Sequence, residues 1–308
     1  MKAMPKQIAS TQSLLAELVR QVEPTPTQKS GARRSHTYLR NLLATGRMQD
    51  RIVDSYLSGS YARATAIRPL EDVDIIFVID PSSWKIPVFS SLPAPADVLR
   101  TFESAIRYRY DDPSLRTQRR SIRLHLYHLD IDVVPAIVTD ESTGMLKIPD
   151  GDVGKWISTG PQIHSTMATE VNSLRGGKFK PLVKLLKHWN RTLPETAQLK
   201  SFAIETIAVR IFKRVGFSGL DEGLGHFFDF LARFSSHFYS GDTYGMTNGL
   251  FGGLEVPDVA TGTNITSSVG ANSKRAFFDH ATKASTWLAN ARHEAGRIDA
   301  LERIFRLR

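Results

Sequence analysis

The sequence contains no cysteine, and its longest apolar runs, such as Ile75 to Ile79, are about five residues. Without cysteine the chain can form neither a disulfide nor a thiolate metal site, which excludes zinc-ribbon functions. Apolar runs of this length fall far short of the roughly 20 residues that span a bilayer. The N-terminal segment also lacks the apolar stretch of a signal peptide. We therefore expect a cytoplasmic protein that has no membrane segment.

The composition is that of an ordinary globular protein with an excess of positive charge. The 308 residues are 41% hydrophobic and 23% charged, and the formal net charge is +9. A chain of this length and composition buries a real core and suits two domains. The charge favours polyanionic ligands such as nucleic acid, nucleoside triphosphates or acidic lipid. The basic residues are nevertheless scattered in small groups, which is typical of a solvated surface.

Two helices are expected at the start of the chain. Apolar residues from 14 to 22 recur at helical spacing, and Pro24 and Pro26 end that pattern. Thr27 is a candidate N-cap for a second helix, which is expected to end near Gly46. Both helices precede the first strand signal.

Strand signals fill residues 52–140, where β-branched residues alternate with polar ones or form apolar runs. Helices are expected after Pro161, at 162–175, 179–191, 201–215, 222–239 and 274–305. A segment rich in Gly, Thr, Ser and Asn, from 241 to 273, interrupts them and is expected to be a lid loop. The fold class is therefore α+β, with a mixed sheet lobe followed by an all-helical lobe.

The densest chemical signal is the segment LSGSYARATAIRPLEDVDIIFVID. Asp72 and Asp74 are two residues apart in a strand, so both carboxylates project from the same face. Two neighbouring negative charges repel, and a divalent cation such as Mg²⁺ is the commonest way to stabilise them. Upstream, Gly59 permits close backbone approach and the Ser60 hydroxyl can hold a phosphate. Either motif alone could be a turn or a chance pattern, but together they indicate a phosphate and metal site.

A third carboxylate is required if two metal ions share this site, because the ions need bridging ligands. The strand LHLDIDVVPAI offers Asp130 and Asp132, which share a face by parity. Their spacing leaves both candidates open.

These motifs resemble the nucleotidyltransferase core of the CD-NTases, a family that includes oligoadenylate synthases, cyclic GMP-AMP synthase and the bacterial DncV-like enzymes. The resemblance rests on GSYARATAIRPLEDVDI, DVVPA, KPLVKLLKHWN, LKSFAIETIA and the opening VEPTPTQKSGARRSHTYLRNLL, and covers about residues 20–215. It implies a polymerase-β-like fold. N-terminal spine helices and the catalytic core would occupy residues 1–160, and a helical domain would occupy 161–308.

The resemblance also implies roles for single residues. It favours Asp132 over Asp130 as the third metal ligand. It makes Ser201 a phosphate contact at a helix start and Phe202 the aromatic residue that stacks on a nucleobase. The residues themselves also allow Ser201 to be only an N-cap and Phe202 to be a core residue.

The helix expected over KPLVKLLKHWNR carries a further candidate. Its apolar residues form one stripe, and Lys184, Lys187 and Arg191 fall on another face. Lys187 matches the lysine with which the family grips a phosphate, although it could also be a surface lysine. Lys184 matches no family position and is expected to be an ordinary surface lysine.

The family resemblance implies an enzyme that joins nucleoside triphosphates into a cyclic di- or trinucleotide and releases pyrophosphate. Two Mg²⁺ ions per site, for which Mn²⁺ can substitute, would serve as cofactors. The product would be a second messenger in bacterial anti-phage signalling (CBASS), read by a separate effector protein. Because the chain has no cysteine for the metal thumb of the animal DNA sensor, no duplex DNA activator is expected. The enzyme is expected to be a monomer.

Two alternatives remain. One is template-independent synthesis of linear oligonucleotides or extension of RNA ends, as in oligoadenylate synthases or tRNA nucleotidyltransferases. The other is a catalytically inactive nucleotide-binding scaffold.

Overall fold

The chain forms two compact units in a computed structural model. One unit runs from Pro24 to Thr166, and the other joins the chain up to Glu23 with the chain from Met167 onward. None of the described helices has the length and hydropathy of a membrane-spanning segment. The structure describes residues 10–110, 115–236, 239–249 and 253–307.

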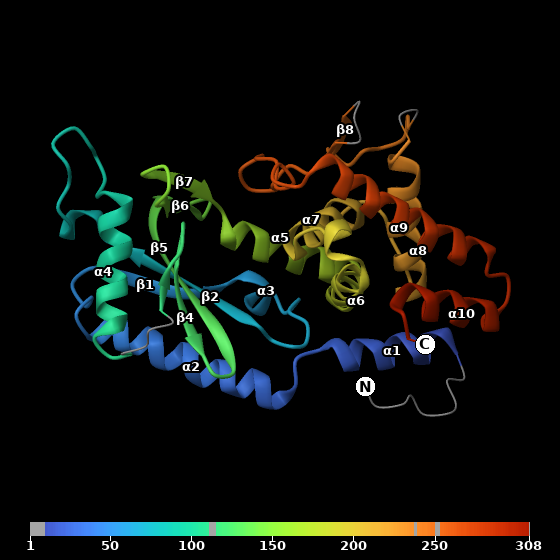
Figure 1. The fold of residues 1–308 in the computed structure, drawn as a ribbon, viewed down its shortest axis with the longest axis horizontal. Helices are drawn as coiled ribbons and strands as arrows, with labels where there is room; N and C mark the ends of the chain where they lie inside the picture. Colours follow the sequence, from blue (N-terminus) through green and yellow to red (C-terminus); the bar gives the residue numbers. More distant parts are fainter. Residues whose placement is uncertain (1–9, 111–114, 237–238, 250–252, 308) are drawn as a thin grey trace. The chain divides into compact units, whose positions relative to one another are not determined.

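The first unit, which we call the sheet unit, is built on a mixed sheet (Figure 1). Its strand order is β1-β2-β5-β4-β3, and β6 and β7 continue from β5. Strands β2 and β5 run parallel, whereas the other pairs are antiparallel. The sheet with its helices confirms the α+β class. The strands are β1 (Ile52–Ser58), β2 (Asp72–Ile79), β3 (Arg116–Thr117), β4 (Ile122–Leu126), β5 (Leu129–Asp140), β6 (Met145–Asp150) and β7 (Lys155–Thr159).

Two long helices cover one face of this sheet. Val73, Ile75 and Phe77 of β2 are fully buried in a core that also contains side chains of α2 and α4. Because side chains alternate along a strand, Asp72 and Asp74 project from the opposite face. The carboxylates therefore lie on the side that α2 and α4 leave uncovered. The helices of this unit are α2 (Pro26–Thr45), α3 (Gly59–Ala62), the 3₁₀ turn η1 (Pro81–Ser83) and α4 (Pro95–Arg107).

Helix α2 begins earlier than the sequence predicts. Thr25 is its N-cap, and the Thr25 side chain accepts a hydrogen bond from the Gln28 backbone, whose own side chain accepts one from the Thr25 backbone. Pro26 is the first helical residue. The prediction that Pro26 ends a helix and that Thr27 caps the next one is wrong. Proline suits the first turn because the N–H that it lacks has no partner within the helix there.

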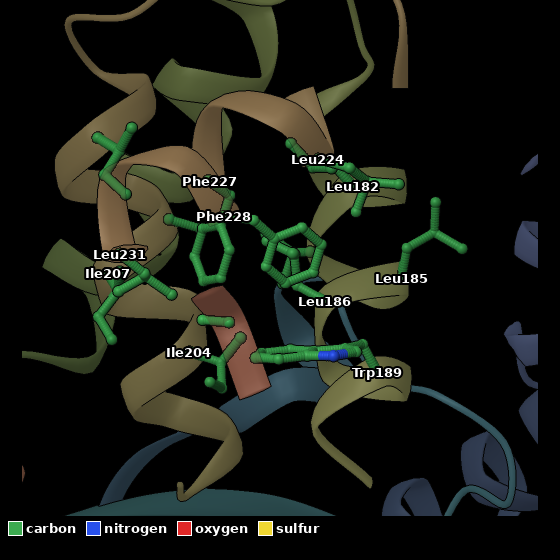
Figure 2. Packing of buried hydrophobic residues seen from close by; sticks show 14 of the residues in the cluster. Leu182, Leu185, Leu186, Trp189, Ile204, Ile207, Leu224, Phe227, Phe228 and Leu231 are labelled. Atoms are coloured by element: carbon green, nitrogen blue, oxygen red, sulfur yellow. The ribbon is translucent and has the colours of Figure 1, made fainter. Parts of the chain in front are cut away.

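The second unit, which we call the helical unit, packs around aromatic residues (Figure 2). Trp189 of α6 lies with its ring centroid 4.7 Å from that of Phe228 of α8 in an edge-to-face arrangement. Ile204 and Ile207 of α7 join the same cluster. The elements are α1 (Thr11–Val22), α5 (Pro161–Leu174), α6 (Phe179–Thr192), η2 (Glu195–Ala197), α7 (Ser201–Phe212), α8 (Leu220–Phe234), β8 (Thr247–Gly249), β9 (Gly253–Glu255), α9 (Ala271–Asn290) and α10 (Glu294–Phe305).

Helix α1 belongs to the helical unit, whereas the division at residue 160 had placed it with the sheet. Leu14, Leu15 and Leu18 are buried in the same cluster as α6. An amphipathic pattern shows that a helix has an apolar face, but it does not show which partner covers that face. The first nine residues of the predicted 1–160 domain lie outside the described residues.

Two predictions for the second half of the chain need correction. The helix expected over 274–305 is two helices, because α9 ends at Asn290 and α10 turns back along it from Glu294 (Figure 1). This turn lets Leu301 and Ile304 pack into the core. The half is also not all-helical, because β8 and β9 form a small hairpin. The helix expected over 222–239 ends at Phe234, and residues 237–238 lie outside the described part.

The segment 241–273 is packed onto the helical unit over its described residues. Leu254 and Val256 are fully buried. The Arg210 guanidinium of α7 donates to the carbonyl of Pro257 through Nε at 3.0 Å and Nη2 at 2.6 Å, and to the carbonyl of Tyr244 through Nη1 at 2.9 Å. Residues 250–252 lie outside the described part. A role for the segment as a lid stays a prediction.

Candidate active site

The Gly-Ser motif lies directly against the first aspartate pair. Ser58, the last residue of β1, pairs with Asp74 across the sheet, and the chain then turns at Gly59 with a φ of +68°. A Cβ atom at Gly59 would lie 1.8 Å from Oδ2 of Asp74, so only glycine fits this position. Ser60 follows in α3, half-buried, and its carbonyl accepts a hydrogen bond from Thr65 N–H at 2.9 Å. The structure thus brings together two motifs that are separate in the sequence.

The two aspartate pairs occupy neighbouring positions on adjacent strands. In the parallel pairing of β2 with β5, Asp74 is opposite Asp132 and Asp72 is opposite Asp130. Partners in register project from the same face of a sheet. Four carboxylates therefore share one small area, which we call the carboxylate face.

Asp72 and Asp74 of the carboxylate face resist ionisation. Burial, followed by the negative charges of Asp72 and Asp132, raises the pKa of Asp74 to about 7, although Arg63 and Arg123 oppose the shift. Burial and the charge of Asp132 likewise raise the pKa of Asp72. Each carboxylate is thus stabilised by a proton or by a nearby cation.

Arg123 of β4 donates two hydrogen bonds to Asp132, the third candidate metal ligand. Its Nε is 3.0 Å from Oδ1 of Asp132, and its Nη2 is 2.6 Å from Oδ2. Arg123 is not among the residues that the sequence motifs predict at the site. The available signal was a two-residue turn at Tyr127 and His128, because antiparallel strands joined there place Arg123 opposite Asp132. The register that follows from this turn places an arginine on the carboxylate face.

Asp130 has different partners from Asp132. It contacts Nδ1 of His125, which lies opposite it on β4, and its Oδ2 is 3.5 Å from Nη1 of Arg123. Asp130 is half-buried, whereas Asp132 is 7% exposed. The expected sharing of one face is thus observed, and the choice of Asp132 as the third metal ligand stays a prediction.

The carboxylate face has the chemistry of a divalent cation site. Aspartates whose pKa is raised by burial and by mutual repulsion are the hard oxygen donors that such a cation prefers. Within the described ranges, no three His, Asp or Glu side chains are already arranged to hold a metal ion. Asp72 and Asp74 fit the donor set of such a cation.

The two lysines expected on the second face of α6 are buried. Lys187 is 2% exposed, and its Nζ lies 2.8 Å from Oε2 of Glu205, a residue of α7 that is also buried. Lys184 is 8% exposed and lies 3.1 Å from Oε1 of Glu23. The expectation that Lys184 is an ordinary surface lysine is wrong, and so is the alternative that Lys187 is one, because α1, α7, α8 and α10 all pack against α6. The match of Lys187 to a phosphate-binding lysine stays a prediction.

Ser201 and Phe202 are the first two residues of α7, and neither is fully buried. Ser201 is exposed, and the N-cap position belongs to Lys200, so Ser201 is not simply the cap. Phe202 is half-buried. Sequence analysis missed Asn190, which fixes this helix start: its Nδ2 donates to the Leu199 carbonyl at 2.8 Å, and its Oδ1 accepts from Leu199 N–H at 3.0 Å. The chain entering α7 is therefore held from α6.

Replacing Lys187 with alanine is expected to destabilise the protein by about 3–5 kcal/mol, because the buried charge of Glu205 loses its ion pair with Lys187. The matched variant K184A should cost only about 1 kcal/mol, since its partner Glu23 reaches solvent. Urea unfolding measures both values. Equal costs would contradict the buried pair. The double variant K187M/E205L, which removes both charges, should recover most of the lost stability, and its KM for the triphosphate then tests Lys187 apart from folding.

A family profile described as "Second Messenger Oligonucleotide or Dinucleotide Synthetase domain" matches residues 9–172. A cyclic AMP-AMP-AMP synthase of Acinetobacter sp. is 31% identical over 96% of this chain and 83% of the relative.

Two solved structures share the fold. That of Escherichia coli MS115-1 CdnC with ATP has a TM-score of 0.72 and 19% identity, covering 96% of this chain and 97% of the other. That of the Bradyrhizobium diazoefficiens CD-NTase CdnG with GTP has a TM-score of 0.72 and 16% identity, covering 97% and 98%.

Proposed function

This chain belongs to the family of second messenger oligonucleotide or dinucleotide synthetases, the CD-NTases, and we propose that it condenses ATP into a cyclic trinucleotide. The resemblance found in the sequence is thereby confirmed, and the protein is a nucleotidyltransferase that makes a cyclic oligonucleotide. The Acinetobacter relative supports the choice of ATP and of a ring of three nucleotides, because its name gives three AMP units. This chain matches that relative over nearly its whole length.

The observation that carries the catalytic assignment is the position of Gly59 against Asp74 on the carboxylate face. A triphosphate held by the Ser60 hydroxyl and the backbone at Gly59 would lie beside Asp72 and Asp74. In this proposal Asp132 completes the ligand set next to the ribose hydroxyl of the acceptor nucleotide.

Nucleotide contacts are also proposed for three residues of the helical unit. Lys187 and Ser201 would bind phosphate oxygens, and Phe202 would stack on a base, since stacking accepts any nucleobase. Ser201 is exposed and Phe202 half-buried, as such contacts require. Lys187 would have to divide its charge between a phosphate and Glu205.

CD-NTases generally use divalent metal ions, and we propose two Mg²⁺ ions, replaceable by Mn²⁺, held by Asp72, Asp74 and Asp132. Bound there, such ions neutralise charge on the triphosphate and lower the pKa of the attacking hydroxyl. The residues of the chain contribute the negative charge that holds the ions and the fixed geometry that orients the substrate. Burial of the carboxylates strengthens their attraction for the ions, because electrostatic interactions weaken in water.

The proposed reaction repeats one step. A ribose hydroxyl oxygen bonds to the α-phosphorus of a second ATP, the bond between that phosphorus and the α–β bridging oxygen breaks, and pyrophosphate leaves with the electron pair while the hydroxyl proton is released. Three such steps join three nucleotides into a ring and release three pyrophosphates. We propose that a separate effector protein reads this product in anti-phage signalling.

Incubation with each nucleoside triphosphate alone and in pairs, with Mg²⁺ or Mn²⁺, tests this function. We expect ATP alone to give a product that resists phosphatase, because a ring has no terminal phosphate, and whose mass is that of three AMP units. A phosphatase-sensitive ladder would indicate linear synthesis instead. A requirement for a second base would overturn the choice of ATP, and the absence of pyrophosphate release would indicate an inactive scaffold.

A further inference from the structure

Arg123 occupies the atoms with which Asp132 would bind a metal ion. The two hydrogen bonds, at 3.0 and 2.6 Å, go to different oxygens of the carboxylate, in the parallel arrangement that makes arginine–carboxylate pairs strong. The side chain of Asp132 is 10% exposed and that of Arg123 is 34% exposed. The guanidinium therefore lies on the solvent side of a nearly buried carboxylate.

The guanidinium supplies positive charge where a metal ion would. The hydrogen bond to Asp132 raises the pKa of Arg123 above its ordinary value, so Arg123 stays charged at every working pH. Its charge also acts on Asp72 and Asp74, and opposes the rise of the pKa of each carboxyl. A second cation at this face would meet both the charge of Arg123 and its hold on Asp132.

Asp132 thus differs from the other two proposed ligands, because it already has a bidentate cationic partner. We propose that Arg123 is a positioning residue that acts as an exchangeable counter-ion of Asp132. It holds the carboxylate in the metal-free protein, and Asp132 becomes a metal ligand only when the guanidinium releases at least one oxygen. This inference rests on the proposed role of Asp132.

Arg123 has a second carboxylate partner on the carboxylate face. Nη1 of Arg123 is 3.5 Å from Oδ2 of Asp130, a neighbouring carboxylate that the proposal does not assign to metal. The guanidinium can therefore loosen its hold on Asp132 while it stays close to negative charge. Metal loading in this scheme is weaker than three carboxylates alone would allow, because every bound ion competes with an internal cation.

Mn²⁺ binding to the nucleotide-free protein, measured from the electron paramagnetic resonance of free Mn²⁺, tests the proposal. R123Q should bind Mn²⁺ about tenfold more tightly than the unaltered protein, which corresponds to about 1.4 kcal/mol. R123K keeps the positive charge but loses the bidentate contact, so its Mn²⁺ affinity should lie between those of R123Q and the unaltered protein. A purely structural role would predict the opposite direction, since a loosened Asp132 would be a poorer ligand.

The matched control is R116Q. Arg116 of β3 lies opposite Arg123 in the pairing of β3 with β4. R116Q removes the same charge one strand further from Asp132, and should change Mn²⁺ affinity by less than about twofold, because exposed charges are screened. A gain equal to that of R123Q would mean that net charge alone sets the affinity, and would overturn the proposal.

The variant D72N/D74N separates this inference from the proposed site. If that variant loses Mn²⁺ binding and R123Q binds no more tightly than the unaltered protein, Arg123 is not a competitor although the metal site stands. If D72N/D74N binds Mn²⁺ like the unaltered protein, the site itself is misassigned and the inference falls with it. Circular dichroism checks folding, and should R123Q not fold, R123K must bind more tightly than the unaltered protein or the proposal is wrong.

Discussion

The double variant D72N/D74N is expected to lose nucleotide transfer completely while it keeps its fold. Asparagine preserves the shape of each side chain but removes both negative charges, so the carboxylate face can no longer hold divalent cations or organise a triphosphate. Pyrophosphate release from ATP in the presence of Mg²⁺ measures this loss. Turnover that survives both substitutions would show that the metal assignment is wrong.

The same variant should be more stable than the unaltered protein in the absence of metal, and the gain should depend on pH. The pKa of Asp74 is about 7 in the folded protein, above its ordinary value of 3.8. The folded state then binds the proton more tightly than the unfolded state does, so stability falls as the pH rises from about 4 to about 7. The asparagine that D74N introduces has no such proton to lose, and its benefit should be small at pH 4 and full at pH 8.

Thermal unfolding without metal measures this difference. We expect the Tm of D72N/D74N to exceed that of the unaltered protein by about 5 °C at pH 8, and the two values to converge near pH 4. The control is D54N, which alters an exposed aspartate of β1 and should leave Tm nearly unchanged at both pH values. A gain of the same size at pH 4 and pH 8 would contradict the raised pKa of Asp74.

Asp132→Asn is expected to lower kcat by several orders of magnitude, whereas Asp130→Asn should lower it by less than about tenfold, since one of the two is expected to ligate metal. The contacts of the two residues differ in the same sense. Asp132 is buried in a row with Asp74, while Asp130 is half-buried and bound to His125.

Single-turnover kinetics at saturating ATP and Mg²⁺ provide the comparison, with circular dichroism as the check on folding. The two variants are matched, because each removes one negative charge from β5 and an ion pair with Arg123. The reverse ranking would move the third ligand to Asp130 and weaken the alignment with the family. Equal losses would mean that the carboxylate face acts by its total charge and not through one assigned ligand.

Local patterns in the sequence were sufficient for several features of the protein. The alternation of Asp72, Val73, Asp74 and Ile75 assigned each side chain to a face, and the burial of Val73 and Ile75 agrees with it. Helical spacing located α5, α6 and α7 to within three residues of their observed bounds. These features depend on the period of the backbone, which neighbours in the sequence alone determine. The motifs also identified the family.

Long-range contacts decided the rest. Neither the partner of Asp132 nor the burial of Lys187 can be read from residue spacing, because Arg123 and Glu205 reach them only through strand register and helix packing. The expectation that Lys184 is a surface residue was wrong for the same reason. A sequence pattern records which residues are polar, but it does not show whether a charged residue meets a buried partner or solvent. Tertiary structure determined which charges meet, since electrostatic interactions depend on distance and burial and not on separation along the chain.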